Sequence, residues 1–263
     1  MTATSEQIDQ HDQATGPTGL YVYGIVEDRA GRVPDGLAGV EDARVELLPH
    51  DGVAAVVGRI HVERPPGRRA DLMAHSRVVE ALDDRGPVVP VQFGSVLADE
   101  DSVIGDLLEP DAEQWRGLLK ALTDRRQFNL RCTYNEAAVL QEVMTEDPEV
   151  AALSARTRAL PEDVTYAERV RLGERVARGV EGKRAQDSAL VLDLVLPHAV
   201  SYSLRDRGGV DHLLDVAFLV GDDRRAAFED ALEQLAEAMH ERARFQLVGP
   251  VPPYDFVDGD WWV

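Results

Sequence analysis

The chain has 263 residues, with 28 Lys plus Arg against 48 Asp plus Glu, so its formal net charge is −20 and its pI is about 4.7. Nucleic-acid binding draws on clustered basic side chains, and this balance therefore argues against a nucleic-acid partner. With 44% hydrophobic and 29% charged residues the chain has the composition of a folded globular protein. No apolar run approaches the roughly 18 residues that a span of a lipid membrane needs.

Residues 1–18 contain neither the basic nor the apolar segment of a secretory signal, and they predict a disordered tail. Cys132 is the only cysteine, so no intrachain disulfide can form. Both observations favour the cytoplasm as the compartment.

Residues 19–124 predict an N-terminal domain that mixes strands and helices. Strands are expected over residues 20–26, 44–48 and 53–60, followed by a helix over 69–82, a short strand over 88–94, and helices over 99–108 and 111–122. Asp51-Gly52 is a strong hairpin signal, so the second and third strands should pair antiparallel. Pro90 favours an edge position or a bulge for the fourth strand because proline has no backbone N–H to donate.

Residues 125–248 predict a second domain. The expected elements begin with a strand over 127–134 and a helix over 136–145, after which Glu146-Asp147-Pro148 marks either a break or the cap of another helix. A long helix is expected from Pro161 to about 196. Strands over 199–204 and 213–220 follow around a turn at Gly208-Gly209, and then a helix over 224–242 capped by Asp222 and a strand over 244–248. Glu168 with Arg171 and Glu174 with Arg178 have the spacing of ion pairs within the long helix.

The predicted fold class is α+β, with two domains that each combine a mixed or antiparallel sheet with helices. In the second domain the order β, helices, β, β, α, β is that of a modified ferredoxin-like fold with an enlarged helical crossover. Residues 249–263 form a proline-rich tail that contains Trp261 and Trp262.

The residue patterns of catalytic, cofactor and metal sites are absent from the sequence. The seven histidines are scattered without metal-ligand spacing, and there is no G-x-S-x-G turn and no G-x-G-x-x-G fingerprint. The segment 179–184 (GVEGKR) resembles a phosphate loop only superficially, since Arg184 replaces the Ser or Thr that would reach magnesium. We therefore predict no catalytic residue, no cofactor and no metal.

Two proline-containing stretches are the candidate partner-binding segments, and residues 88–95 and 247–254 within them carry no charge. The acidic excess lies instead at predicted helix starts, helix faces and tails. Three prolines stiffen the second stretch and would present Tyr254 and Phe256, unless this tail simply docks onto its own domain. The candidate residues are Val89, Pro90, Val91, Phe93 and Gly94 in the first stretch, and Gly249, Pro250, Pro253, Tyr254 and Phe256 in the second.

Several blocks, taken together and in this order, resemble the gas vesicle protein F/L family. They are LYVYGIV at 20–26, GVAAVV at 52–57, His75, VVPVQFG at 88–94 and LVGPVPPYDF at 247–256. Gln92 stands where a basic residue is expected, and Val251 stands where an aromatic is common. These departures leave open whether the chain is of the F or the L type.

The resemblance implies a non-enzymatic protein that helps to build gas vesicles, with two α+β domains and a ferredoxin-like element. Its expected partners are the major gas vesicle shell protein, which is small and hydrophobic, and other gas vesicle accessory proteins. It would act in assembly or as a minor structural component, located at the vesicle shell and in the cytoplasm. The alternatives are a ferredoxin-like small-ligand sensor or enzyme, since this fold class hosts many functions, and a general interaction scaffold.

Overall fold

The computed structural model describes residues 16–205, 209 and 211–257. Most of the predicted N-terminal tail, Gly208 of the predicted turn, and Trp261 and Trp262 lie outside these residues. The chain divides into two compact units. The first comprises the chain up to Arg85 together with Pro90–Arg116, and the second comprises Gly86–Val89 together with the chain from Gly117.

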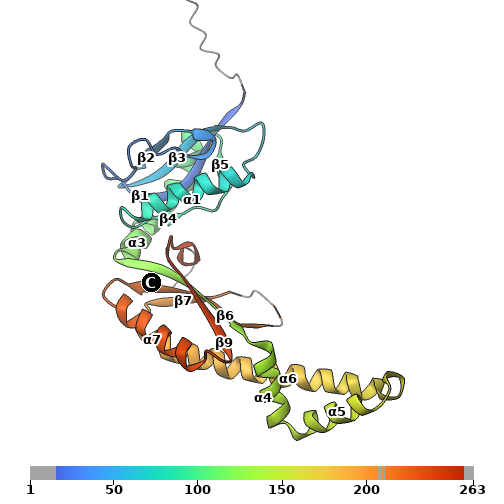
Figure 1. Ribbon diagram of the computed structural model, residues 1–263. Coiled ribbons are helices and arrows are strands. Elements are labelled where there is room, and N and C mark those ends of the chain that lie inside the picture. Colours follow the sequence, from blue (N-terminus) through green and yellow to red (C-terminus); the bar gives the residue numbers. More distant parts are fainter. Residues whose placement is uncertain (1–15, 206–208, 210, 258–263) are drawn as a thin grey trace, which may run out of the picture. The chain divides into compact units, whose positions relative to one another are not determined.

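The first sheet is built around a buried central strand (Figure 1). Its strands are β1 (Thr18–Glu27), β2 (Val45–His50), β3 (Val53–His61), β4 (Val89–Pro90) and β5 (Val96–Leu97). They are ordered β2-β3-β1-β4, and β5 pairs with β1 off this path. The predicted hairpin is confirmed by the antiparallel pairing of β2 with β3, and its turn residues Asp51 and Gly52 have φ of 46° and 82°.

The helices of the first half begin with α1 (Arg69–Asp83), whose buried face includes Val78, Val79 and Leu82. The sequence predicts a regular helix over 99–108, and this is wrong in detail. The segment is a short helix, α2 (Glu100–Ser102), followed by a π-helical segment over Val103–Leu108, in which Glu109 N–H donates to Ile104 O five residues back. The last helix here is α3 (Ala112–Leu122).

The second sheet has the order β7-β8-β6-β9, and its neighbouring strands pair antiparallel. The strands are β6 (Arg125–Tyr134), β7 (Ser201–Leu204), β8 (His212–Gly221) and β9 (Ala243–Val251). β6 and β8 lie in the middle, whereas β7 and β9 are the two edges. The expectation of an α+β fold is confirmed; the ferredoxin-like comparison for this half stays an interpretation.

The helices of the second unit are α4 (Glu136–Glu146), α5 (Pro148–Ala159), α6 (Glu162–Val195) and α7 (Arg225–Ala238). Asp147 caps α5 by accepting hydrogen bonds from the N–H groups of Glu149 and Val150, and Pro148 occupies the first turn, as proline can. The predicted helix over 224–242 is too long. Arg224 rather than Asp222 is at its N-cap, and the chain turns after Ala238 to enter β9.

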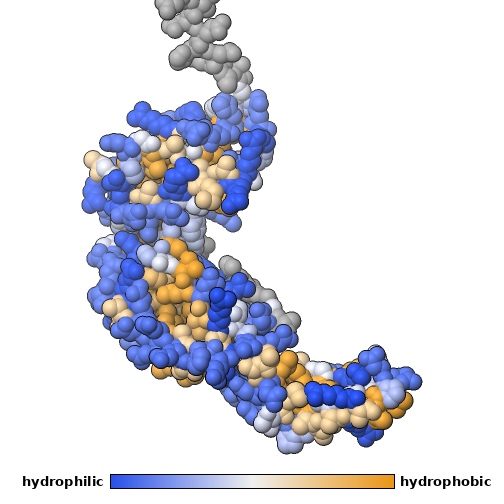
Figure 2. Space-filling model, viewed as in Figure 1, coloured by the Kyte–Doolittle hydropathy of each residue, from blue (hydrophilic) through white to orange (hydrophobic). Residues whose placement is uncertain are grey.

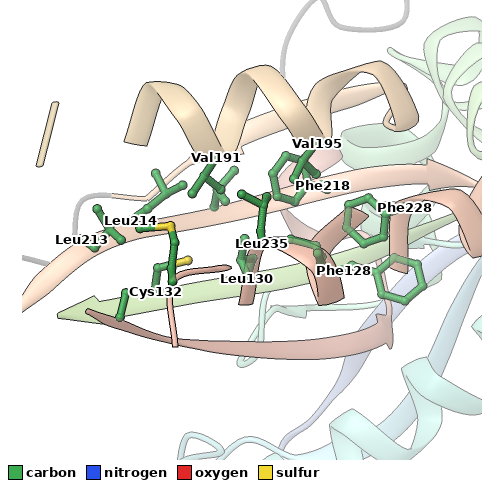
Figure 3. Packing of buried hydrophobic residues seen from close by; sticks show 14 of the residues in the cluster. Phe128, Leu130, Cys132, Val191, Val195, Leu213, Leu214, Phe218, Phe228 and Leu235 are labelled. Atoms are coloured by element: carbon green, nitrogen blue, oxygen red, sulfur yellow. The ribbon is translucent and has the colours of Figure 1, made fainter. Parts of the chain in front are cut away.

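The core of the second unit lies between the sheet and helices α6 and α7 (Figure 3). Alternate residues of β6, among them Phe128, Leu130 and Cys132, point to this layer because side chains along a strand alternate between its two faces. Phe228 of α7 packs with Phe128 and Phe218, its ring centroid 5.4 Å from each of theirs. Among the described residues, no helix is both long enough and apolar enough to cross a membrane.

Candidate partner-binding segments

The first candidate segment is mostly built into the fold rather than presented on it. Val89 and Pro90 are buried, Val91 and Phe93 are half-buried, and only Gly94 is exposed. The sequence predicts a strand over 88–94, but β4 stops at Pro90, because residues 92–95 form a turn in which Ser95 N–H and Oγ–H both donate to Gln92 O. Gly94 sits in this turn with φ of 93°, a conformation that favours glycine.

Buried aromatic residues fasten this turn to β1 and α1. Gly94 N–H donates to Tyr21 Oη at 3.0 Å, and Tyr21 Oη lies 2.9 Å from Nδ1 of His75. The phenol accepts from Gly94, so its own proton is available for His75 Nδ1 when the imidazole proton is on Nε2. His75 packs against Tyr23 and edge-on to Phe93, so this histidine holds the turn in place.

Burial lowers the pKa of His75 to about 4. In the unfolded chain this histidine is protonated below about pH 6.5, whereas in the folded chain it stays neutral down to about pH 4. The free energy of unfolding is therefore highest above pH 6.5 and falls as the pH drops towards 4. We expect a loss of about 2 kcal/mol between pH 7.5 and pH 5, measured by urea unfolding. His75→Phe should flatten this dependence, and an unchanged slope in His75→Phe would contradict the assignment.

An uncharged pocket of about 430 Å³ lies beside this turn in the first unit. It is lined by Thr18, Gly19, Val62, Pro65, Pro66, Gly94, Val96, Leu97 and Ala98. Gly94 is the only candidate residue of the first segment that lines this pocket.

The second candidate segment contains an exposed sheet edge. β9 ends the strand order, so one of its sides pairs with β6 and the other has no neighbouring strand among the described residues. Residues 245–251 (FQLVGPV) are uncharged, and Leu247 and Val248 are 38% and 49% exposed. Figure 2 shows hydrophobic surface where Figure 1 draws β9.

β9 continues through Gly249, Pro250 and Val251, so the last strand is longer than the predicted 244–248. Gly249 and Pro250 are exposed within it, and Val251 pairs with Gln127. A Cβ on Gly249 would lie 2.6 Å from Cδ1 of Phe128 and 3.0 Å from Gln127 O, so a larger residue would displace the core ring or the neighbouring strand.

The rest of the segment docks through a polar cluster that we call the tail clasp: Gln127, Asn129, Arg205, Asp215 and Asp255. Gln127 Nε2 donates to Asp255 Oδ2 at 2.6 Å, and Asp255 N–H donates back to Gln127 Oε1 at 3.1 Å. Arg205 Nε donates to Asp255 Oδ1 at 2.8 Å, and these hydrogen bonds to Asp255 raise the pKa of Arg205.

The three remaining candidates lie around this clasp. Pro253 is buried, Phe256 is 1% exposed, and Tyr254 is 39% exposed. The tail therefore folds back up to Phe256, which was one of the two alternatives that the sequence left open. What it presents to a partner is the edge of β9 and part of Tyr254.

Two polar clusters in the second unit were not predicted from the sequence. One is the tail clasp. The other, the β9 anchor, joins α4 and α6 to the residue just before β9 and consists of Tyr134, Glu142, Lys183, Asp187 and Arg242. Arg242 donates to Asp187 at 3.0 and 3.1 Å and to Glu142 at 2.6 and 3.0 Å.

Charged residues line a cavity of the second unit. It measures about 590 Å³, lies between α4, α5 and α6, and is lined by Asp147, Arg175 and Lys183 among others. These charges are engaged with protein groups: Arg175 with Asp147 at 2.8 Å, and Lys183 with Glu146 at 2.8 Å. In the part of the chain that the structure describes, no three His, Cys, Asp or Glu side chains are placed to hold a metal ion.

Cys132 and the phosphate-loop-like segment carry no evident chemistry. Cys132 is fully buried, and burial raises the pKa of its thiol to about 12, so the reactive thiolate is disfavoured. Residues 179–184 lie inside α6, where the backbone N–H groups are used by the helix itself.

Comparisons with known proteins agree over nearly the whole chain. The family model described as gas vesicle synthesis protein GvpL/GvpF matches residues 19–258. Gas vesicle protein F of Streptomyces sp. (strain CB03234) is 34% identical over 240 residues, covering 90% of this chain and 99% of the relative. Gas vesicle protein L of the same organism is 27% identical over 256 residues, covering 90% and 91%.

Solved structures share the fold. The crystal structure of the gas vesicle protein GvpF from Anabaena sp. PCC7120 superposes with a TM-score of 0.80 at 23% identity, covering 92% of this chain and 99% of that one. GvpF from Microcystis aeruginosa gives a TM-score of 0.74 at 22% identity, covering 91% and 99%.

Proposed function

The chain belongs to the gas vesicle synthesis protein GvpL/GvpF family, and on that basis we propose that it binds the major gas vesicle shell protein through the open edge of β9. Family membership is consistent with a role in gas vesicle formation, in association with other gas vesicle proteins. The family is not known as a family of enzymes. In the proposal the protein is an assembly or minor structural component that works at the shell and in the cytoplasm.

The observation that carries the proposal is the edge of β9. An edge strand has backbone N–H and C=O groups without a partner, and an extended segment of another protein can bind by adding a strand there. The described part of β9 from Phe245 to Val251 has no charged side chain to repel an apolar strand. Pro250 limits the usable edge, since it has no N–H to donate.

The rest of the second unit holds this edge in place before a partner arrives. Arg242 anchors the start of β9, and the tail clasp fixes the chain just after its end. A strand that is already ordered costs less conformational entropy on binding than a flexible peptide. The net charge of −20 would keep the unassembled protein soluble beside a hydrophobic partner.

The small-ligand sensor or enzyme has less support. It requires a pocket with convergent polar groups, and in the cavity between α4, α5 and α6 Arg175 pairs with Asp147 and Lys183 pairs with Glu146 instead. The proposed shell-protein binding needs no such pocket, because main-chain hydrogen bonds along an edge supply the affinity.

A lysine on the edge strand should weaken binding strongly while leaving the fold intact. We expect Val248→Lys to weaken co-purification with the major shell protein at least tenfold, because a lysine on an edge strand places a charge beside the apolar side chains of an added strand. Val248 is 49% exposed, so the substitution should leave the melting temperature nearly unchanged.

Leu72→Lys is the matched control, since Leu72 is a 46% exposed apolar residue on α1. It should bind the shell protein like the unmodified chain. If Val248→Lys binds as well as this control does, β9 is not the binding edge.

A further inference from the structure

α5 and the first half of α6 form a helical arm that extends from the sheet of the second unit (Figure 1). The two helices bury few large apolar side chains against each other: the buried residues include Ser154, Thr157 and Thr165. The Thr157 and Thr165 hydroxyls donate to carbonyls of their own helices or of the residue just before. The arm is therefore a helix pair with little apolar core of its own.

Ion pairs flank one side of this helix pair. Arg156 of α5 contacts Glu168 of α6 at 2.9 Å, and Arg175 of α6 contacts Glu149 of α5 at 2.8 Å. Residues seven apart lie on one side of a helix, which places Glu168 with Arg175 and Glu149 with Arg156. Glu168 thus pairs across the helices, not with Arg171 as its sequence spacing suggests.

The opposite flank of α6 carries an unpartnered apolar stripe, formed by Tyr166, Val170, Gly173 and Ala177. These positions follow the spacing i, i+4, i+7, i+11, which makes one line along a helix. Val170 follows Glu168 by two residues, and Ala177 follows Arg175 by two. Each therefore lies about 200° around the helix from an ion-paired residue. Tyr166 and Val170 are 74% and 45% exposed, and a Cβ on Gly173 would meet nothing within 4 Å.

An acidic rim runs along the outer side of this stripe. Asp163, Glu174 and Glu181 are eleven and seven residues apart, so they form a line next to Val170. Glu181 pairs with Arg184, but no described residue supplies a basic partner for the side chains of Asp163 or Glu174. On the other side of the stripe, α5 contributes the exposed small residues Ala151 and Ala155, with Arg158 at the far end. Figure 2 shows hydrophobic surface on the arm.

We propose that the stripe binds an amphipathic helix of a partner protein, with a small or apolar face and Lys or Arg along the flank that meets the acidic rim. A third helix would bury the stripe and complete a three-helix bundle with α5 and α6, while Gly173 and Ala177 let its backbone approach closely. The surface is separate from the edge of β9, so the two interactions can fail independently.

Charge decides between this partner and a second copy of the chain. Two copies docked stripe to stripe with antiparallel α6 helices would bring their acidic rims together, and facing like charges are unfavourable in an interface. The rest of a second copy is also a poor source of a basic helix. Residues 148–184 contain eight basic and six acidic residues, and the other residues of the chain include 42 acidic and only 20 basic ones. A basic flank on a foreign helix complements the rim instead.

The test uses a synthetic helical peptide with Ala and Leu at i, i+3, i+4 and i+7 and Lys on the flank, and measures its binding to the full chain by fluorescence anisotropy. We expect saturable binding, weakened about tenfold by Val170→Glu. Val164→Glu is the control: it adds the same charge to α6 at a 68% exposed valine, off the stripe and four residues before Glu168.

Nonspecific attraction of a cationic peptide would be strengthened equally in both variants, and that result would overturn the proposal. A matched peptide with Glu in place of Lys should bind at least tenfold more weakly, and equal binding of the two peptides would also contradict it. Sedimentation equilibrium tests whether a second copy of the chain binds the stripe. If the unmodified chain is a dimer and Val170→Glu is a monomer, a second copy occupies the stripe and the proposed partner is wrong. Circular dichroism of both variants should show unchanged helix content.

Discussion

A chain that ends after Val248 is expected to melt at a clearly lower temperature than the full chain. The truncation removes the end of β9, the Asp255 carboxylate that Gln127 and Arg205 hold, and Phe256, which is 1% exposed. Loss of a buried phenylalanine alone typically costs about 3–5 kcal/mol. Thermal unfolding followed by circular dichroism measures the difference.

A chain that ends after Val257 is the control, since it keeps Asp255 and Phe256 and should melt close to the full-length protein. Shell-protein binding by both truncations separates a structural role from a recognition role. Docking of the tail would be the wrong account if the shorter chain melted normally and lost only its binding.

Elements whose determinants are local could be predicted from the sequence. Asp51-Gly52 adopts the left-handed conformation that a tight hairpin needs, and Asp147-Pro148 starts α5 by capping and by a proline in the first turn. Both signals lie within a few residues of the structure they cause.

Predictions failed where distant contacts decide the structure. β4 ends early because the following turn is held by Tyr21 and His75, which come from β1 and α1. α7 ends early because the chain must turn to join the sheet as β9. Apolar spacing reports which face of an element is buried, but it does not report where a neighbouring element forces the element to stop.

The candidate segments also combine local features that the sequence shows with distant contacts that it does not show. Their lack of charge is visible in the sequence, and it distinguishes β9 from its acidic surroundings. The tail clasp is not visible there, because Gln127 and Asp255 are 128 residues apart and neither belongs to a motif. The sequence therefore left open whether the tail is free or docked, and the answer depends on long-range hydrogen bonds.

Replacing Arg242 is expected to destabilise the second unit more than any surface substitution. Its guanidinium bonds both Glu142 and Asp187, and Tyr134 donates to the same Asp187 carboxylate at 2.6 Å. Asp187 is only 7% exposed, so without Arg242 its charge would be poorly compensated. Breaking a buried pair from one side costs about 3–5 kcal/mol, and the 29% exposure of the Arg242 side chain favours the lower end of that range.

Urea unfolding of Arg242→Met at pH 7 measures this loss, with Arg244→Met as the control, since Arg244 is exposed on β9 two residues later. Burial alone would raise the pKa of Glu142, but hydrogen bonds from Lys183 and Arg242 outweigh it and hold that pKa below its ordinary value. The stabilisation from Glu142 is thus complete above the ordinary glutamate pKa of about 4.3 and is lost as the pH falls towards the lowered value. Arg242→Met should therefore lose less stability on acidification than the unmodified chain does, and an equally steep acid dependence would show that Arg242 does not hold the Glu142 charge.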